Sequence, residues 1–230
     1  MVAHVETVAA DFLGFHSDLL PPPEGSAEPV CLLLGSERGF CGDFNEALLD
    51  RLEGFVEQRH SVSPLVMVTG HKLCAHVQAD PRVVASFDGA TTVGEVERTL
   101  HAIARALAVL QSQHAMLSLR VFHHDPELQQ VIITEVLPCF EHCRDEKPKF
   151  THEPLIHLSP QAFLGALLDH YLYSVLHEIM YVSLMAENLR RVRHLEGAVR
   201  HMDEKSSALR QEEIIEEIEV ILPSTASQDH

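Results

Sequence analysis

The sequence predicts an α/β protein in which an open sheet domain lies between a short N-terminal helix and a very long C-terminal helix. Two patterns lead to this prediction. Between residues 28 and 150, short apolar runs alternate with amphipathic segments, which is typical of an open α/β sheet. From 159 to 222, no proline follows Pro160, and apolar residues recur at steps of three and four, the spacing of one helical face.

The overall composition excludes several classes of protein. With 230 residues, of which 46% are hydrophobic, the chain can build a substantial core. Its net charge of -17 would repel phosphates, so we expect no nucleic-acid partner. No apolar run is long enough to cross a bilayer, and the N-terminus lacks a secretory signal, so we expect no direct membrane insertion. The five cysteines are interpreted as free thiols.

Residues 1–20 are predicted to be the end of an amphipathic helix. Their apolar side chains recur at helical spacing: Val5, Val8, Phe12, Phe15 and Leu19. The loop at 21–26 begins with three prolines and cannot continue this helix.

The sheet domain, 28–150, is predicted from its apolar runs. Breakers bound continuous apolar runs at 29–35 and 64–70, which is typical of strands buried on both faces in a parallel sheet. Strands are predicted at 29–35, 64–70, 83–87, 116–122 and 130–137, and helices at 46–58, 71–77 and 92–111. Thr92 and Glu95 have the spacing of a capping box. We expect 123–126 to be a turn, with its His123-His124-Asp125 exposed to solvent.

The segment 159–222 is predicted to be one long helix of a coiled coil. Ser159 can cap it, Pro160 suits the first helical position, and Pro223 should end it, leaving a disordered tail at 223–230. Such a helix would be about 95 Å long, and an uncapped run of this length is typical of a coiled coil. Two helices with a bend near Gly197 are the alternative.

Catalytic and metal-binding motifs are incomplete. The loop Gly35–Gly42 follows a strand and precedes a helix, but it lacks the lysine of a phosphate-binding loop and carries Glu37. Cys139, His142 and Cys143 could contact one metal, although a zinc site normally needs a fourth ligand. We expect no cofactor and no catalytic site. A small enzyme with a cysteine-histidine metal remains an alternative.

The segment Gly35–Asn45, G-S-E-R-G-F-C-G-D-F-N, resembles G-S-D-R-G-L-C-G-G-x-N of the gamma subunit of F-type ATP synthases. Further segments are similar to motifs of that family in the same order: 83–89, 150–154, 166–172, 183–188 and 210–218. The resemblance extends from about Val5 to Leu222.

The resemblance implies a non-catalytic rotor subunit. Its Rossmann-like domain would lie at the foot of an antiparallel coiled coil. It would couple ion-driven rotation of the c-ring to ATP synthesis or hydrolysis in the α3β3 head, on the cytoplasmic side of the bacterial inner membrane, as a peripheral protein. The partners implied are the alpha, beta and epsilon subunits and the c-ring. The resemblance assigns Arg210, Gln211 and Glu217 to the β-subunit catch loops, and Phe150, His152 and Glu153 to the ring.

Two features depart from the family pattern. Only the last turns of the family's long basic N-terminal helix correspond to residues 1–20, so most of the C-terminal helix would lack an intramolecular partner. Near the tip, Ile215 replaces the usual threonine among several glutamates. The alternative function is therefore a free-standing interaction protein of the gamma fold, with self-association or capture of a partner helix through the long helix.

Overall fold

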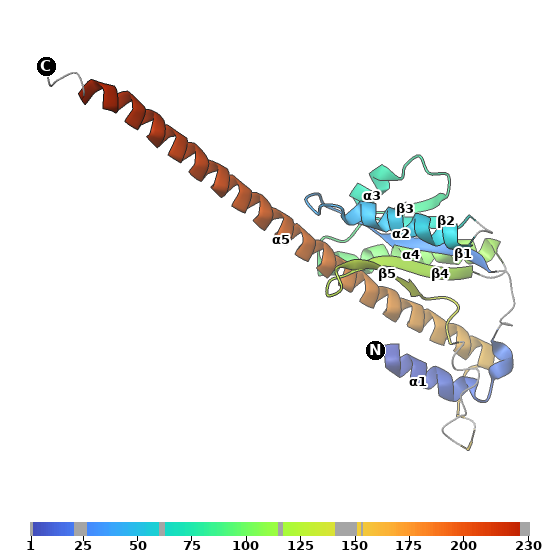
Figure 1. Ribbon diagram of the computed structural model, residues 1–230. Coiled ribbons are helices and arrows are strands. Elements are labelled where there is room, and N and C mark those ends of the chain that lie inside the picture. The colour runs from blue at the N-terminus through green and yellow to red at the C-terminus, as the bar shows by residue number, and fades with distance from the viewer. Residues whose placement is uncertain are drawn as a thin grey trace.

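A five-stranded sheet forms the centre of the protein, and one helix of 66 residues runs along the sheet domain and continues far beyond it (Figure 1). The computed structural model describes residues 2–20, 27–59, 63–114, 117–140, 151–152 and 154–225. The elements are α1 (Val2–Leu13), a 3-10 turn (Ser17–Leu19), β1 (Glu28–Leu34), α2 (Phe44–Arg59), β2 (Leu65–Thr69), α3 (His71–His76), β3 (Val83–Phe87), α4 (Val93–Gln113), β4 (Leu117–Asp125), β5 (Gln130–Glu135) and α5 (Pro160–Thr225).

The strand order is β3-β2-β1-β4-β5. All neighbouring strands pair in parallel except β4 and β5, which form an antiparallel hairpin. The predicted fold class, an α/β sheet domain followed by a long C-terminal helix, is confirmed. The sheet is mixed because the short connection after β4 returns the chain directly along its neighbour.

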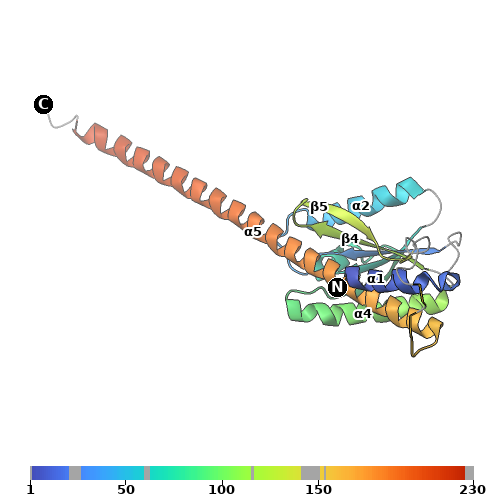
Figure 2. The same cartoon turned by 90° about the horizontal axis from the view of Figure 1, so that it is seen from below.

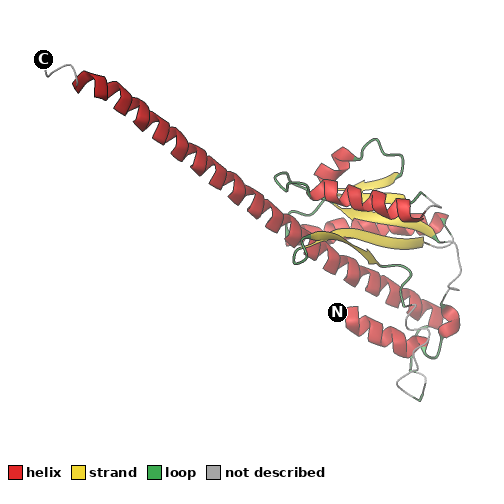
Figure 3. Cartoon of the chain, viewed as in Figure 1, coloured by secondary structure: helices red, strands yellow, loops and turns green. Residues whose placement is uncertain are grey.

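Helices cover both faces of the sheet (Figure 3). Side chains of β1 alternate between the faces: Leu32 packs with α4 and α5, whereas Leu33 packs with α2 and α3. Both leucines are fully buried, as expected of a central parallel strand. The capping box of Thr92 and Glu95 begins α4 as predicted. The sheet therefore holds α5 through its first half against one face.

The N-terminal helix is shorter than expected, because α1 ends at Leu13 rather than at residue 20. After Gly14, the amide groups of Phe15 and His16 bond to carbonyls three residues back, at 3.1 and 3.2 Å, which tightens the chain into a turn. Figures 1 and 2 show α1 beside the first turns of α5. Phe12 is buried there, with its ring 4.7 Å from that of Phe163.

The long helix is continuous, so the alternative of two helices bent near Gly197 is wrong. It also passes Pro223 and ends at Thr225, beyond the expected end at Leu222. Residues 226–230 of the predicted tail lie outside the described residues. No helix in the described part of the chain has the length and apolarity to cross a membrane.

The free part of α5 exposes an apolar stripe. Every described side chain from Val192 to Glu216 lies in the exposed class. The stripe consists of Val192, Leu195, Val199, Met202, Leu209, Ile214, Ile215 and Ile218, each 43 to 61% exposed. Exposed apolar surface of this extent indicates an interaction site.

The expected turn at 123–126 is wrong for its first three residues, because β4 extends to Asp125. His123 and His124 belong to β4 and are only 3% and 4% exposed. The strand extends because β5 pairs with it up to Asp125 and Gln130. These histidines are therefore part of the core, not of a solvated turn.

Candidate functional site

The loop after β1 meets the ends of β2 and β3 and the side of α5. Gly70 has φ +93°, and a Cβ there would lie 2.5 Å from the Gly35 carbonyl oxygen, so only glycine allows this approach. Ser36 is held by Asn45, whose Oδ1 accepts from the Ser36 amide at 3.0 Å. This packing fixes the start of the loop.

The carboxylate of Glu37 connects the loop after β1 to two neighbouring segments. Its Oε2 accepts hydrogen bonds from the backbone amides of His71, at 2.8 Å, and Gly89, at 2.7 Å. The Glu37 carboxylate thus ties the loop after β1 to the segments that follow β2 and β3, and its charge would repel a phosphate. The geometry agrees with a structural turn at this position.

Glu187 of α5 fastens the loop to the long helix. It is 5% exposed, and its Oε1 accepts from the Arg38 amide at 3.3 Å and from the Arg191 guanidinium. Arg191 also donates to the Gly39 carbonyl at 3.3 Å and contacts Cys41 Sγ at 3.8 Å. We call Glu187, Arg191 and the backbone of 38–41 the latch.

Burial dominates the electrostatics of the latch. It raises the pKa of the Glu187 carboxyl, and the Arg38 amide and Arg191 oppose this rise. Burial, followed by the Glu187 charge, raises the pKa of the Cys41 thiol. Cys41 is therefore a protonated packing residue rather than an activated nucleophile.

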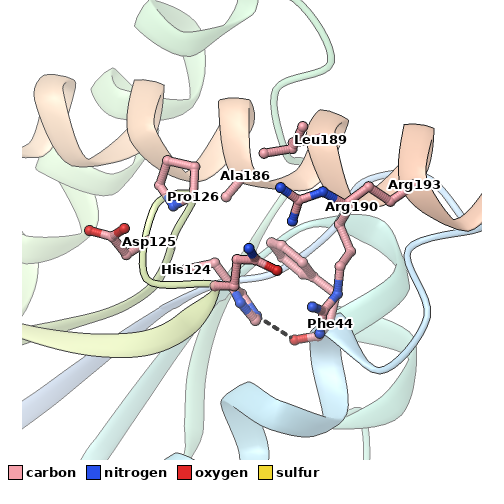
Figure 4. A pocket seen from close by; sticks show the side chains of 9 residues that line it. Phe44, His124, Asp125, Pro126, Ala186, Leu189, Arg190 and Arg193 are labelled. Atoms are coloured by element: carbon pink, nitrogen blue, oxygen red, sulfur yellow. Dashed lines mark hydrogen bonds between the residues drawn. The ribbon is translucent and has the colours of Figure 1, made fainter.

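Beside the latch, the tip of the β4–β5 hairpin and the start of α2 meet α5 (Figure 4). Arg190 bonds to Asp43 at 2.5 Å. The ring of His124 stacks on Phe44 with centroids 3.8 Å apart, and its Nε2 lies 2.8 Å from the Phe44 carbonyl oxygen. The cavity between these elements has a volume of about 20 Å³, which holds one water at most. This cavity is too small for an organic ligand, and the contacts around it serve to join α2, the hairpin and α5.

Those of the residues assigned by resemblance that the structure describes fall at opposite ends of α5. Arg210 and Gln211 are exposed on its projecting part, and His152 is exposed before its first turn. The backbone of Glu217 belongs to α5, whereas its side chain, Phe150 and Glu153 lie outside the described residues. They do not form a single site.

The metal-binding candidates are not assembled in the described part of the chain. No group of three or more histidine, cysteine or acidic side chains is placed there to hold a metal. Cys139 is buried in the core with α1, while His142 and Cys143 lie outside the described residues.

The latch and the two buried histidines were not predicted. The spacing of Glu187 and Arg191, four residues apart on a helix, could have suggested an ion pair. Nothing in the sequence indicated that the loop of residues 38–41 would contact this pair. Nor did the sequence indicate that β5 pairs with β4 as far as His123 and His124.

Comparisons with known proteins give a consistent answer. The sequence model of the ATP synthase family matches residues 2–227. No curated protein sequence matches the chain. The central stalk and c-ring structure of the Tetrahymena thermophila mitochondrial ATP synthase contains a similar chain, with 13% identity and a TM-score of 0.59, over 86% of this chain and 99% of that one.

A rotor chain of the Euglena gracilis mitochondrial ATP synthase is also similar, with 14% identity and a TM-score of 0.47, over 93% of this chain and 92% of that one. At these identities, the Tetrahymena structure supports the fold alone. The family match covers nearly the whole chain, from α1 to the end of α5. This chain belongs to the ATP synthase gamma-subunit family.

Proposed function

We propose that this protein is the central-stalk subunit of a bacterial F-type ATP synthase and couples rotation of the c-ring to ATP synthesis or hydrolysis in the α3β3 head. The proposal rests mainly on the arrangement of α5. It is fastened to the sheet domain through its first half and projects through its second half with an exposed apolar stripe. A subunit that transmits rotation needs both a broad base and a narrow projecting helix. We call the sheet domain with α1 and the first half of α5 the foot, and α5 beyond Val192 the shaft.

The shaft and the foot must turn as one body. Three sets of contacts join them: the core between α4, α5 and the sheet, the packing of α1 on α5, and the latch. These contacts lie before Val192, so torque received by the foot enters the shaft at its base. The subunit itself would carry out no bond chemistry.

The proposed partners follow from the ends of α5. The apolar stripe would pack inside the α3β3 head, as one strand of a coiled coil. Arg210, Gln211 and Glu217 would meet the β-subunit catch loops. Phe150, His152 and Glu153 would face the c-ring, and the epsilon subunit would bind the foot. The protein would thus be peripheral, on the cytoplasmic side of the inner membrane.

Substitution of the proposed catch-loop contacts tests this function. The double variant Arg210→Ala/Gln211→Ala should reduce ATP-driven ion pumping in the assembled motor, because these side chains project from the shaft without partners in the described chain. Arg105→Ala, on the exposed side of α4, is the matched control and should leave pumping unchanged. Equal pumping by the double variant and the wild type would contradict the assignment.

The exposed stripe also supports a second candidate, a free-standing interaction protein that pairs through α5. Light scattering on the purified chain distinguishes the two. A dimer that survives dilution favours the second candidate, whereas a monomer that joins the α3β3 head favours the stalk.

A further inference from the structure

We propose that His123 and His124 make the junction between the sheet and α5 sensitive to acid, closed while both imidazoles are neutral and opened when they are protonated. The two histidines are adjacent in β4, so their side chains point to opposite faces of the sheet. The acid sensitivity itself is a property of the isolated chain. Only its effect on the motor rests on the proposed function.

His124 connects three elements at the junction. Its Nε2–H donates to the Phe44 carbonyl at the start of α2, and its ring lies flat on the Phe44 ring. Figure 4 shows His124 in the space between the start of α2 and α5, which contributes Ala186, Leu189 and Arg190. A positive charge on this ring would be removed from water and would lie close to the Arg190 guanidinium.

His123 lies on the other face and is only 3% exposed. Its Nε2 lies 3.0 Å from Thr134 Oγ1 on β5. Its Nδ1 is buried without a hydrogen bond of good geometry among the described residues, and a weaker contact with the His124 backbone raises the His123 pKa. The imidazolium form carries a donor on both nitrogens, so protonation would leave one buried N–H with only this weak contact.

The charges around the pair favour the neutral form at His124. Arg190 and Arg193 approach from α5, and Arg190 lowers the His124 pKa. Asp43, before α2, acts in the opposite direction, but it is engaged by Arg190. At His123, the backbone of His124 and then Asp125 of β4 raise the pKa.

Burial is the first cause at both histidines, and it lowers both pKa values. The open state has an ordinary imidazole pKa of about 6.5. Above that pH, both states are neutral and the junction keeps its full stability. As pH falls below it, the open state binds protons that the closed state does not, so stability is lost until the lowered pKa is reached.

Opening at His124 would reach the latch through the chain. Phe44 follows Asp43 directly, and Asp43 is the partner of Arg190. Release of Phe44 would therefore loosen the ion pair to α5 and the loop that carries the latch. In the proposed stalk, acid would then weaken the connection between foot and shaft.

Hydrogen exchange of the full chain at several pH values, corrected for the intrinsic exchange rate, tests the inference. The opening equilibrium of residues 183–193 should rise up to tenfold per histidine for each pH unit below about 6.5. In His123→Gln/His124→Gln, this rise should be lost, and any remaining change should have the opposite sign because the Glu187 pKa is raised. The control His101→Gln/His201→Gln removes two exposed histidines and should behave as the wild type.

A titration of the wild-type imidazoles by NMR gives a second measurement that needs no variant. Both histidines should titrate below pH 6.5. Protection of 183–193 that does not change with pH, or ordinary titration of both rings, would overturn the inference. The outcome of this test is distinguishable from that of the Arg210→Ala/Gln211→Ala experiment. Hydrogen exchange is measured on the isolated chain, whereas pumping is measured on the assembled motor at neutral pH.

Discussion

Replacement of Glu187 by alanine should destabilise the protein by about 3 kcal/mol. The carboxylate is 5% exposed and accepts from both the Arg38 amide and Arg191. Its removal leaves the Arg191 guanidinium, whose side chain is 18% exposed, without its carboxylate partner. Breaking a buried pair costs about 3 to 5 kcal/mol, and the partial exposure of Arg191 places this variant at the lower end.

Thermal and urea unfolding of the purified chain measure this loss. For a chain of this size, it corresponds to a fall in Tm of about 6 to 12 °C. Glu196→Ala, an exposed glutamate on the same helix, is the control and should change stability by less than about 0.5 kcal/mol. Glu187→Ala with Arg191→Met should cost less than the sum of the single variants. A Glu187→Ala protein as stable as the control would refute the latch as a buried pair.

Three further substitutions probe other parts of the structure. All are tested by the same unfolding measurements, and the third also by binding. Phe12→Ala should cost about 3 kcal/mol, because it removes a buried ring between α1 and α5; a loss below 1 kcal/mol would contradict this packing. Gly70→Ala should destabilise by about 2 kcal/mol or more, since φ is +93° and the Cβ would meet the Gly35 backbone. Val199→Gln, 53% exposed, should leave stability within about 0.5 kcal/mol but weaken binding to the α3β3 head, and equal binding would count against the stripe as a contact.

The elements of the sheet could be predicted because each has a local signal. Two examples are β3, predicted at its observed bounds Val83–Phe87, and α4, whose capping box marks its start. The length of α5 was also encoded locally, in the steps of its apolar residues. Its end differs from the prediction, because Pro223 predicts a stop after Leu222, whereas α5 continues to Thr225.

The junction could not be predicted because it depends on contacts distant in the sequence. The latch joins residues about 150 positions apart. His123 and His124 were assigned to a turn because a histidine pair before Asp125 and Pro126 resembles a polar loop, and only the pairing with β5 reveals the strand. The partner assignments came from resemblance to the family, because exposed side chains such as Arg210 carry no local signal of what they bind.

The central claim is that the projecting half of α5 enters the α3β3 head while the sheet domain remains outside. Electron cryomicroscopy of the chain assembled with α and β subunits tests this most directly. The account predicts density for the helix beyond Val192 along the axis of the ring, with the sheet domain below it. A complex with the helix outside the ring, or a chain that pairs with itself and leaves the ring empty, would contradict the account.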